Sequence, residues 1–135
     1  MFSFFGVNAI TDMLVYFKWP IPPNMEYASV ILALMCEYLL FMFHLHGRTD
    51  LDVLLHTLLL HAIAACMVAF ALELKYPDSI LCALRRAYFI LLQGTWFWLI
   101  GWILYPPFEG SYRWDKDDHK QMMIATMIFT QWLYF

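Results

Sequence analysis

The sequence predicts an all-α fold, a polytopic transmembrane bundle of about five helices in one domain over residues 1–135. Hydrophobic residues make up 63% of the chain and charged residues only 14%, whereas roughly 45–50% apolar residues is usual in soluble domains. The mean hydropathy is +0.62, and several apolar runs approach the ~20 residues that a helix needs to cross a bilayer. We therefore expect a multi-pass integral membrane protein whose main partner is the lipid bilayer.

Prolines, one glycine and short polar residues divide the chain into its segments. The stretch from Trp19 to Pro23 ends the first, because proline lacks a backbone N–H and forces its neighbours into extended conformations. Asn24 is expected to cap the second helix, Gly47 to follow its end, and Thr49 or Asp50 to cap the third. The expected spans are 2–19, 25–46, 51–74, 87–105 and 121–135, and the first and last are expected to be incomplete.

Basic residues leave two features of this topology open. Residues 87–105 include no charged side chain and form the clearest span. The preceding residues 78–86, which end in Arg85 and Arg86, would then form a separate interfacial helix. Lysines and arginines are divided almost evenly between the two sets of loops, so the positive-inside rule assigns no cytoplasmic face.

Charge and cysteine content argue against two classes of protein. The net charge is −3 and the chain has no basic run, so nucleic acid is not an expected partner. Cys36, Cys66 and Cys82 lie in or beside apolar runs without a CxxC spacing. They are expected to be small buried residues, with no role in disulfides or zinc binding.

Four polar side chains are expected to meet near the turn between the second and third spans. Glu37 lies in an apolar run, where a charged side chain costs about 2.5–3.5 kcal/mol on insertion scales, so it is expected to face other helices. A tight antiparallel hairpin would bring Glu37 to within one turn of His56, and His44 level with Asp52. Asp52 and His56 are four residues apart, a spacing at which a carboxylate can bond an imidazole. These four residues form the predicted polar site.

Three interpretations of this site are open. The favoured one is structural, with the groups satisfying each other's hydrogen bonds between packed helices. The second is a metal or proton site, in which His44, Asp52 and His56 are suitable zinc ligands, although their spacing alone predicts no cofactor. In the third, these residues belong to an exposed turn. Secondary candidates are His46, His61, Gln93 and Arg86, and His61 is expected on a different helical face from His56.

The fourth segment carries small and aromatic residues that suggest two further roles. Gly94 and Gly101 are positions where another helix can approach closely. Gln93 needs a hydrogen-bond partner, which the third helix is expected to supply. The tryptophans either line a pocket for a lipid or sterol or, as is more common, simply pack or lie toward an interface. They are Trp96, Trp98 and Trp102.

Several motifs together resemble one known family. They are His44-x-His46-Gly47-Arg48, Leu51-Asp52 with His56, the run from Leu91 to Phe97, Ile100-Gly101, the run from Leu104 to Pro107, and Trp114-Asp115. The chain is similar in these motifs, from about residue 30 to 120, to the transmembrane protein 45 family of multi-pass proteins of unknown activity. The resemblance implies a seven-span protein of the endomembranes or plasma membrane, of which this chain would be a fragment or short isoform. It supplies no reaction.

The sequence thus favours a membrane protein with a scaffold, trafficking or small-ligand role, with other membrane proteins as further partners. Enzymatic activity is not the favoured interpretation. The alternative is a membrane-embedded, metal-dependent hydrolase that uses Glu37, His44, Asp52 and His56, and such an enzyme needs three ligands and an open coordination position. Proton-coupled transport would call for inverted repeats or broken helices, and the sequence suggests neither.

Overall fold

The computed structural model describes residues 2–106, 114–115 and 118–134. Over these ranges the regular structure is entirely helical, which confirms the predicted all-α class. The five helices are α1 (Phe2–Tyr16), α2 (Met25–Phe43), α3 (Asp50–Lys75), α4 (Ile80–Leu104) and α5 (His119–Trp132).

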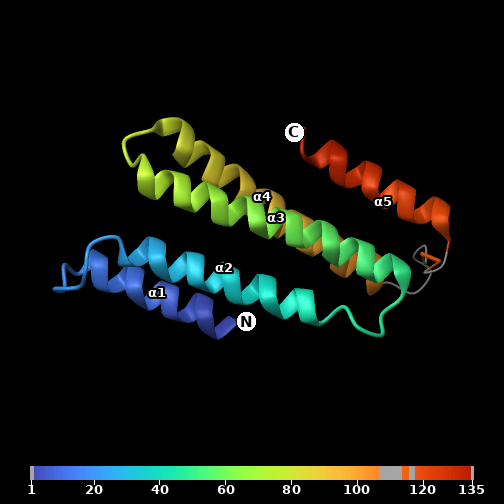
Figure 1. The fold of residues 1–135 in the computed structure, drawn as a ribbon, viewed down its shortest axis with the longest axis horizontal. Helices are drawn as coiled ribbons and strands as arrows, with labels where there is room; N and C mark the ends of the chain where they lie inside the picture. The colour runs from blue at the N-terminus through green and yellow to red at the C-terminus, as the bar shows by residue number, and fades with distance from the viewer. Residues whose placement is uncertain (1, 107–113, 116–117, 135) are drawn as a thin grey trace.

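Helix α3 is the centre of the bundle. It packs against α2, α4 and α5, and α1 packs against α2. The connections from α1 to α2 and from α3 to α4 lie at one end of the bundle, and the connection from α2 to α3 lies at the other (Figure 1). Each residue of α2, α3 and α4 therefore has a defined depth between these two ends, and the polar groups below are located by that depth.

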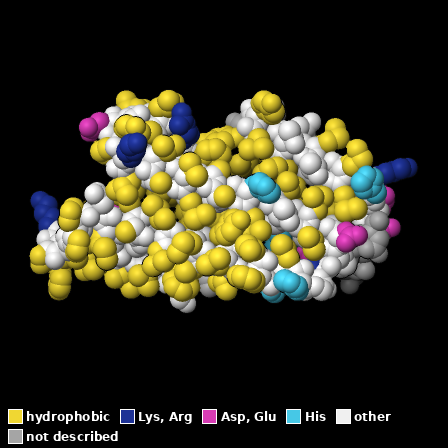
Figure 2. Space-filling model, in the orientation of Figure 1, with side chains coloured by type: hydrophobic (Ala, Val, Ile, Leu, Met, Phe, Trp, Pro, Cys, Tyr) yellow, Lys and Arg dark blue, Asp and Glu magenta, His cyan; other side chains and the backbone are white. Residues whose placement is uncertain are grey.

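Helices α2, α3 and α4 are long and apolar enough to cross a membrane. With 26 residues, α3 extends about 39 Å at 1.5 Å per residue. Helices α1 and α5 have 15 and 14 residues, or about 21–22 Å. Hydrophobic side chains cover most of the visible surface (Figure 2), as expected of a bundle surrounded by lipid.

The fourth helix differs from the expected span. It is continuous from Ile80 to Leu104, so the alternative of a separate interfacial helix over residues 78–86 was wrong. The two arginines do not interrupt it, because Arg86 pairs with a carboxylate of α3 and Arg85 is exposed. The chain turns before this helix, where Ser79 N–H donates to the carbonyl of Tyr76 at 3.1 Å.

The helix ends show where side-chain capping was misjudged. Asn24 precedes α2, but its φ is +64° and its side chain makes no capping hydrogen bond. Thr49 precedes α3 in an extended conformation, also without a side-chain cap. Helix α2 ends at Phe43, three residues earlier than expected. Gly47 has φ +78°, a left-handed conformation in the turn that glycine adopts at low cost.

The core lies between α3 and α4 and extends to α5. Trp96 is fully buried, its ring centroid lies 4.7 Å from that of Phe129 on α5, and its indole Nε1–H donates to the Leu55 carbonyl at 3.3 Å. Trp98 and Trp102 are 74% and 45% exposed. The pocket of three tryptophans was therefore wrong, and packing was the correct alternative for Trp96.

Two predictions about small residues had different outcomes. A Cβ atom added at Gly94 or at Gly101 would meet nothing within 4 Å, so neither glycine marks a close helix approach and that expectation was wrong. Cys66 and Cys82 are buried free thiols, as predicted, and Cys36 is a half-buried free thiol.

Candidate functional site

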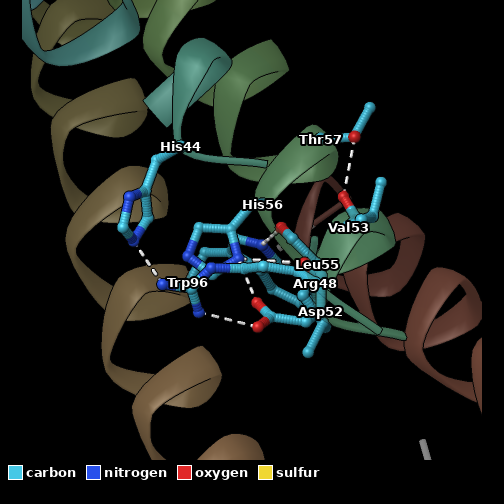
Figure 3. Close-up of polar contacts among 8 residues, drawn as sticks. All are labelled: His44, Arg48, Asp52, Val53, Leu55, His56, Thr57 and Trp96. Carbon is cyan, nitrogen blue, oxygen red and sulfur yellow. Dashed lines mark hydrogen bonds and ion pairs between the residues drawn. The ribbon is translucent and has the colours of Figure 1, made fainter. Parts of the chain in front are cut away.

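Four side chains form a chain of polar contacts at the turn between α2 and α3 (Figure 3). Arg48 Nη1 donates to Asp52 Oδ2 at 2.7 Å, and Arg48 Nη2 contacts His44 Nε2. Asp52 Oδ1 lies 2.7 Å from His56 Nδ1, which also lies 2.9 Å from the backbone carbonyl oxygen of Asp52. The ring nitrogen is aligned with that carbonyl oxygen and not with Oδ1. The predicted proximity of Asp52 and His56 is confirmed.

Arg48 is the member of this turn cluster that the sequence reasoning missed. Its hydrogen bond to Asp52 raises the pKa of the guanidinium, which therefore stays charged. The signal was present in the spacing, because His44, Arg48, Asp52 and His56 follow one another at intervals of four residues. Arg48 was named only as part of a motif that resembles a known family.

The turn cluster does not have the geometry of a metal centre. Across the described ranges, no group of three or more His, Cys, Asp or Glu side chains is arranged to hold a metal ion. Arg48 lies between His44 and Asp52, where its guanidinium contacts His44 Nε2 and donates to Asp52 Oδ2. The expected zinc ligands therefore have no common coordination point, and the geometry gives the hydrolase alternative no support.

Glu37 forms a second polar group at mid-depth. It is 4% exposed, and Gln93 Nε2 on α4 donates to its Oε2 at 2.9 Å. The prediction that Glu37 faces other helices is confirmed, but its expected contact with His56 was wrong, and so was a partner for Gln93 on the third helix. Phe41, one turn after Glu37, takes the position beside His56 with ring centroids 5.5 Å apart.

A third polar group joins α2, α3 and α4 near the opposite end of the bundle. Glu73 is 5% exposed. Its Oε1 accepts a hydrogen bond from the Tyr27 hydroxyl at 3.2 Å, and its Oε2 lies 2.7 Å from Arg86 Nε. The Nε–H is not aligned for a hydrogen bond, so this contact is an ion pair. The available signal was a pair of opposite charges on the two sides of the α3–α4 turn.

The other secondary candidates lie outside these groups. His46 is exposed in the turn. His61 is also exposed, and its Nδ1 lies 2.7 Å from the carbonyl oxygen of Thr57 on its own helix. The prediction that His61 faces away from His56 is confirmed.

A cavity of about 490 Å³ lies between α1, α2, α3 and α4. It touches the polar group of Glu37 through Gln93, and the polar group of Glu73 through Tyr27 and Arg86. Asp12 of α1 and Glu26 of α2 add two carboxylates to its wall. The sequence analysis did not predict the cavity, because its existence depends on how α1 is packed on α2.

The coupling between Glu37 and Gln93 can be measured in a double-mutant cycle. Glu37→Leu is expected to lower the free energy of unfolding in lipid bicelles by about 1–3 kcal/mol, because it leaves the half-buried Gln93 amide unpaired. His46→Ala, in the exposed turn, is the control and should change it by less than about 0.5 kcal/mol. The Glu37→Leu/Gln93→Leu double variant should be more stable than the sum of the single losses predicts. Additive losses would mean that the two side chains act independently.

Long apolar helices, with buried carboxylates paired to polar side chains of neighbouring helices, define a multi-pass helical membrane protein. The chain belongs to the family of unknown function DUF716, whose model matches residues 23–135. It is 27% identical over 132 residues to human transmembrane epididymal protein 1, a match that covers 96% of this chain and 47% of the relative. Mouse transmembrane epididymal protein 1A is 25% identical over 105 residues, covering 78% of this chain and 34% of the relative.

These comparisons confirm the coarser part of the expectation, a family of transmembrane proteins without an assigned activity. The matched relatives are named as transmembrane epididymal proteins, a different name from the transmembrane protein 45 group that the motifs suggested. The chain spans about half, or less, of the length of these curated relatives.

Proposed function

We propose that this chain is the part of an integral membrane protein that binds a small amphiphilic ligand inside its helical bundle. The observation that carries the proposal is the cavity of about 490 Å³ between four helices. Its volume falls in the range of roughly 300–1,000 Å³ that is typical of small-molecule sites. A wall that combines hydrocarbon with a few polar groups suits a molecule that has a tail and a head.

A small-ligand role accounts for the cavity better than a scaffold or trafficking role does. Close packing is a main source of attraction between helices in lipid, and a cavity between helices, even one that is partly open to the surface, removes contacts from the side chains that line it. A protein that only presents its outer surface to partners gains nothing from such a cavity.

Two further parts of this proposal rest on the sequence motifs. They are location in the endomembranes or the plasma membrane, and a narrower relationship to the transmembrane protein 45 group.

Gly94 and Gly101 provide a matched pair of variants to test the proposal. Both lie on α4, and a side chain at either position enters open space. Only Gly94 lies on the cavity wall, so Gly94→Leu fills the cavity and Gly101→Leu does not. Each change should also favour the helix by up to about 1 kcal/mol, because glycine is a poor helix former. Loss of folding would therefore not explain a loss of binding.

The measurement is photo-crosslinking of the purified protein in phosphatidylcholine nanodiscs. The probes are three clickable diazirine compounds of one alkyl chain length, with an amine, a hydroxyl or a carboxylate head. At least one probe should label cavity-lining peptides of the wild type, and this labelling should be lost in Gly94→Leu and kept in Gly101→Leu. Equal labelling of the two variants by every probe would overturn the proposal.

A further inference from the structure

The charged groups on the cavity wall are not balanced. The described lining residues include the carboxylates of Asp12 and Glu26 and the guanidinium of Arg86. The charge of Arg86 is already compensated, because its Nε lies 2.7 Å from the buried carboxylate of Glu73. Within residues 2–106, 114–115 and 118–134, neither Asp12 nor Glu26 forms an ion pair with a lysine, arginine or histidine. The wall therefore carries excess negative charge.

A hydrogen-bonded side chain fixes Asp12 at the seam between α1 and α2. Asn8 Nδ2 donates to Asp12 Oδ2 at 3.3 Å, and Asn8 Oδ1 accepts from the Ser29 hydroxyl of α2 at 2.6 Å. Asn8 therefore links Asp12 to the neighbouring helix and engages one of its carboxylate oxygens. Among the described residues, the other carboxylate oxygen of Asp12 accepts no hydrogen bond.

Aromatic rings share the cavity wall with these carboxylates. Phe5 and Tyr27 both line it, and the Tyr27 ring is fixed by the bond from its hydroxyl to Glu73. The face of an aromatic ring attracts an ammonium group. Carboxylates together with aromatic rings favour a cation and disfavour an anion. Arg86, the cationic side chain among the described residues of this wall, already contacts Glu73 and the Phe70 ring, whose centroid lies 5.7 Å from the guanidinium carbon.

Resting on the function proposed above, we infer that the ligand is a hydrophobic amine. Its ammonium group lies at the carboxylates of Asp12 and Glu26, and its tail lies along the apolar wall formed by Val30, Leu34 and Ile90. Such a head and tail match the two kinds of surface in the cavity.

The three-probe experiment tests this assignment with charge-removing variants. The double variant Asp12→Asn/Glu26→Gln keeps the shape of both side chains and removes both charges. The control is Asp78→Asn, which removes an exposed carboxylate at the same end of the bundle and outside the cavity wall. Labelling by each probe is measured relative to its residual labelling of Gly94→Leu, which corrects for different partition of the probes into the bilayer.

In the wild type, the amine probe should label the cavity more strongly than the hydroxyl probe, and the carboxylate probe least. The double variant should reduce amine labelling by about tenfold, the effect of losing charge-assisted contacts, and leave hydroxyl labelling unchanged. Asp78→Asn should change neither. If the hydroxyl or carboxylate probe gave Gly94-dependent labelling and the amine probe were not preferred, the assignment of an amine ligand would be overturned, and the ligand-binding function would stand. Absence of Gly94-dependent labelling by all three probes would overturn the ligand-binding function itself.

Discussion

Trp96→Ala is expected to lower the free energy of unfolding by about 3–5 kcal/mol, the cost of removing a large, fully buried aromatic side chain. Trp96 has no exposed surface, and it joins α4 to α5 through Phe129 and to α3 through the Leu55 carbonyl. The variant loses contacts with two other helices at once. Unfolding should be followed in bicelles by circular dichroism, since the change removes an intrinsic fluorophore.

Trp98 is the matched control for this prediction, because it lies two residues further along the same helix and is 74% exposed. Trp98→Ala should change the free energy of unfolding by less than about 0.5 kcal/mol. Trp96→Phe should lie between the wild type and Trp96→Ala, because it keeps the ring contact with Phe129 and loses the indole N–H. Similar losses for Trp96→Ala and Trp98→Ala would contradict the packing described above.

Arg86→Met is the second variant with a large expected effect, a loss of about 3 kcal/mol. The change leaves the Glu73 carboxylate buried without its cation, and breaking a buried pair by removing one partner costs about 3–5 kcal/mol. The lower end of that range applies because the Arg86 side chain is 38% exposed, whereas that of Glu73 is 7% exposed. The free energy of unfolding in bicelles again measures the loss.

Two further variants isolate the ion pair from other effects of losing an arginine. Arg85→Met removes the preceding, exposed arginine and should be nearly neutral. The double variant Glu73→Met/Arg86→Met removes both charges together and should recover most of the loss, because no unpaired charge remains. If the double variant were as unstable as Arg86→Met, the cost would come from lost packing and not from the buried, unpaired charge of Glu73.

The sequence was sufficient for features that depend on one segment alone. Apolar runs predict the helices, and a spacing of four residues predicts the proximity of Asp52 and His56 in one helix. Burial of Glu37 follows from the cost of a charge in lipid. Each of these conclusions needs only the local helical geometry and the nature of the solvent.

The partners of buried groups could not be derived in the same way. Depth along a hairpin brings Glu37 to within one turn of His56, but the rotation of α2 about its axis decides which neighbour it meets, and that rotation places Phe41 beside His56 and Glu37 beside Gln93. The cavity depends on the packing of α1 as well. Neither the rotation of α2 about its axis nor the packing of α1 is determined by the residue pattern of one segment.

The three polar groups lie at three successive depths of the bundle, Glu73 near one end, Glu37 in the middle and Asp52 near the other. Contacts between apolar side chains determine the position of a helix along its neighbour less strictly than a polar pair does, since lipid tails are as apolar as the side chains they replace. A shift of α2 or α4 by a single turn would here separate Gln93 from Glu37 and, at the same time, Tyr27 or Arg86 from Glu73. The polar pairs therefore fix the positions of the helices relative to one another along the bundle axis. A thinner bilayer is therefore expected to tilt α2, α3 and α4 as a unit, without sliding one helix along another.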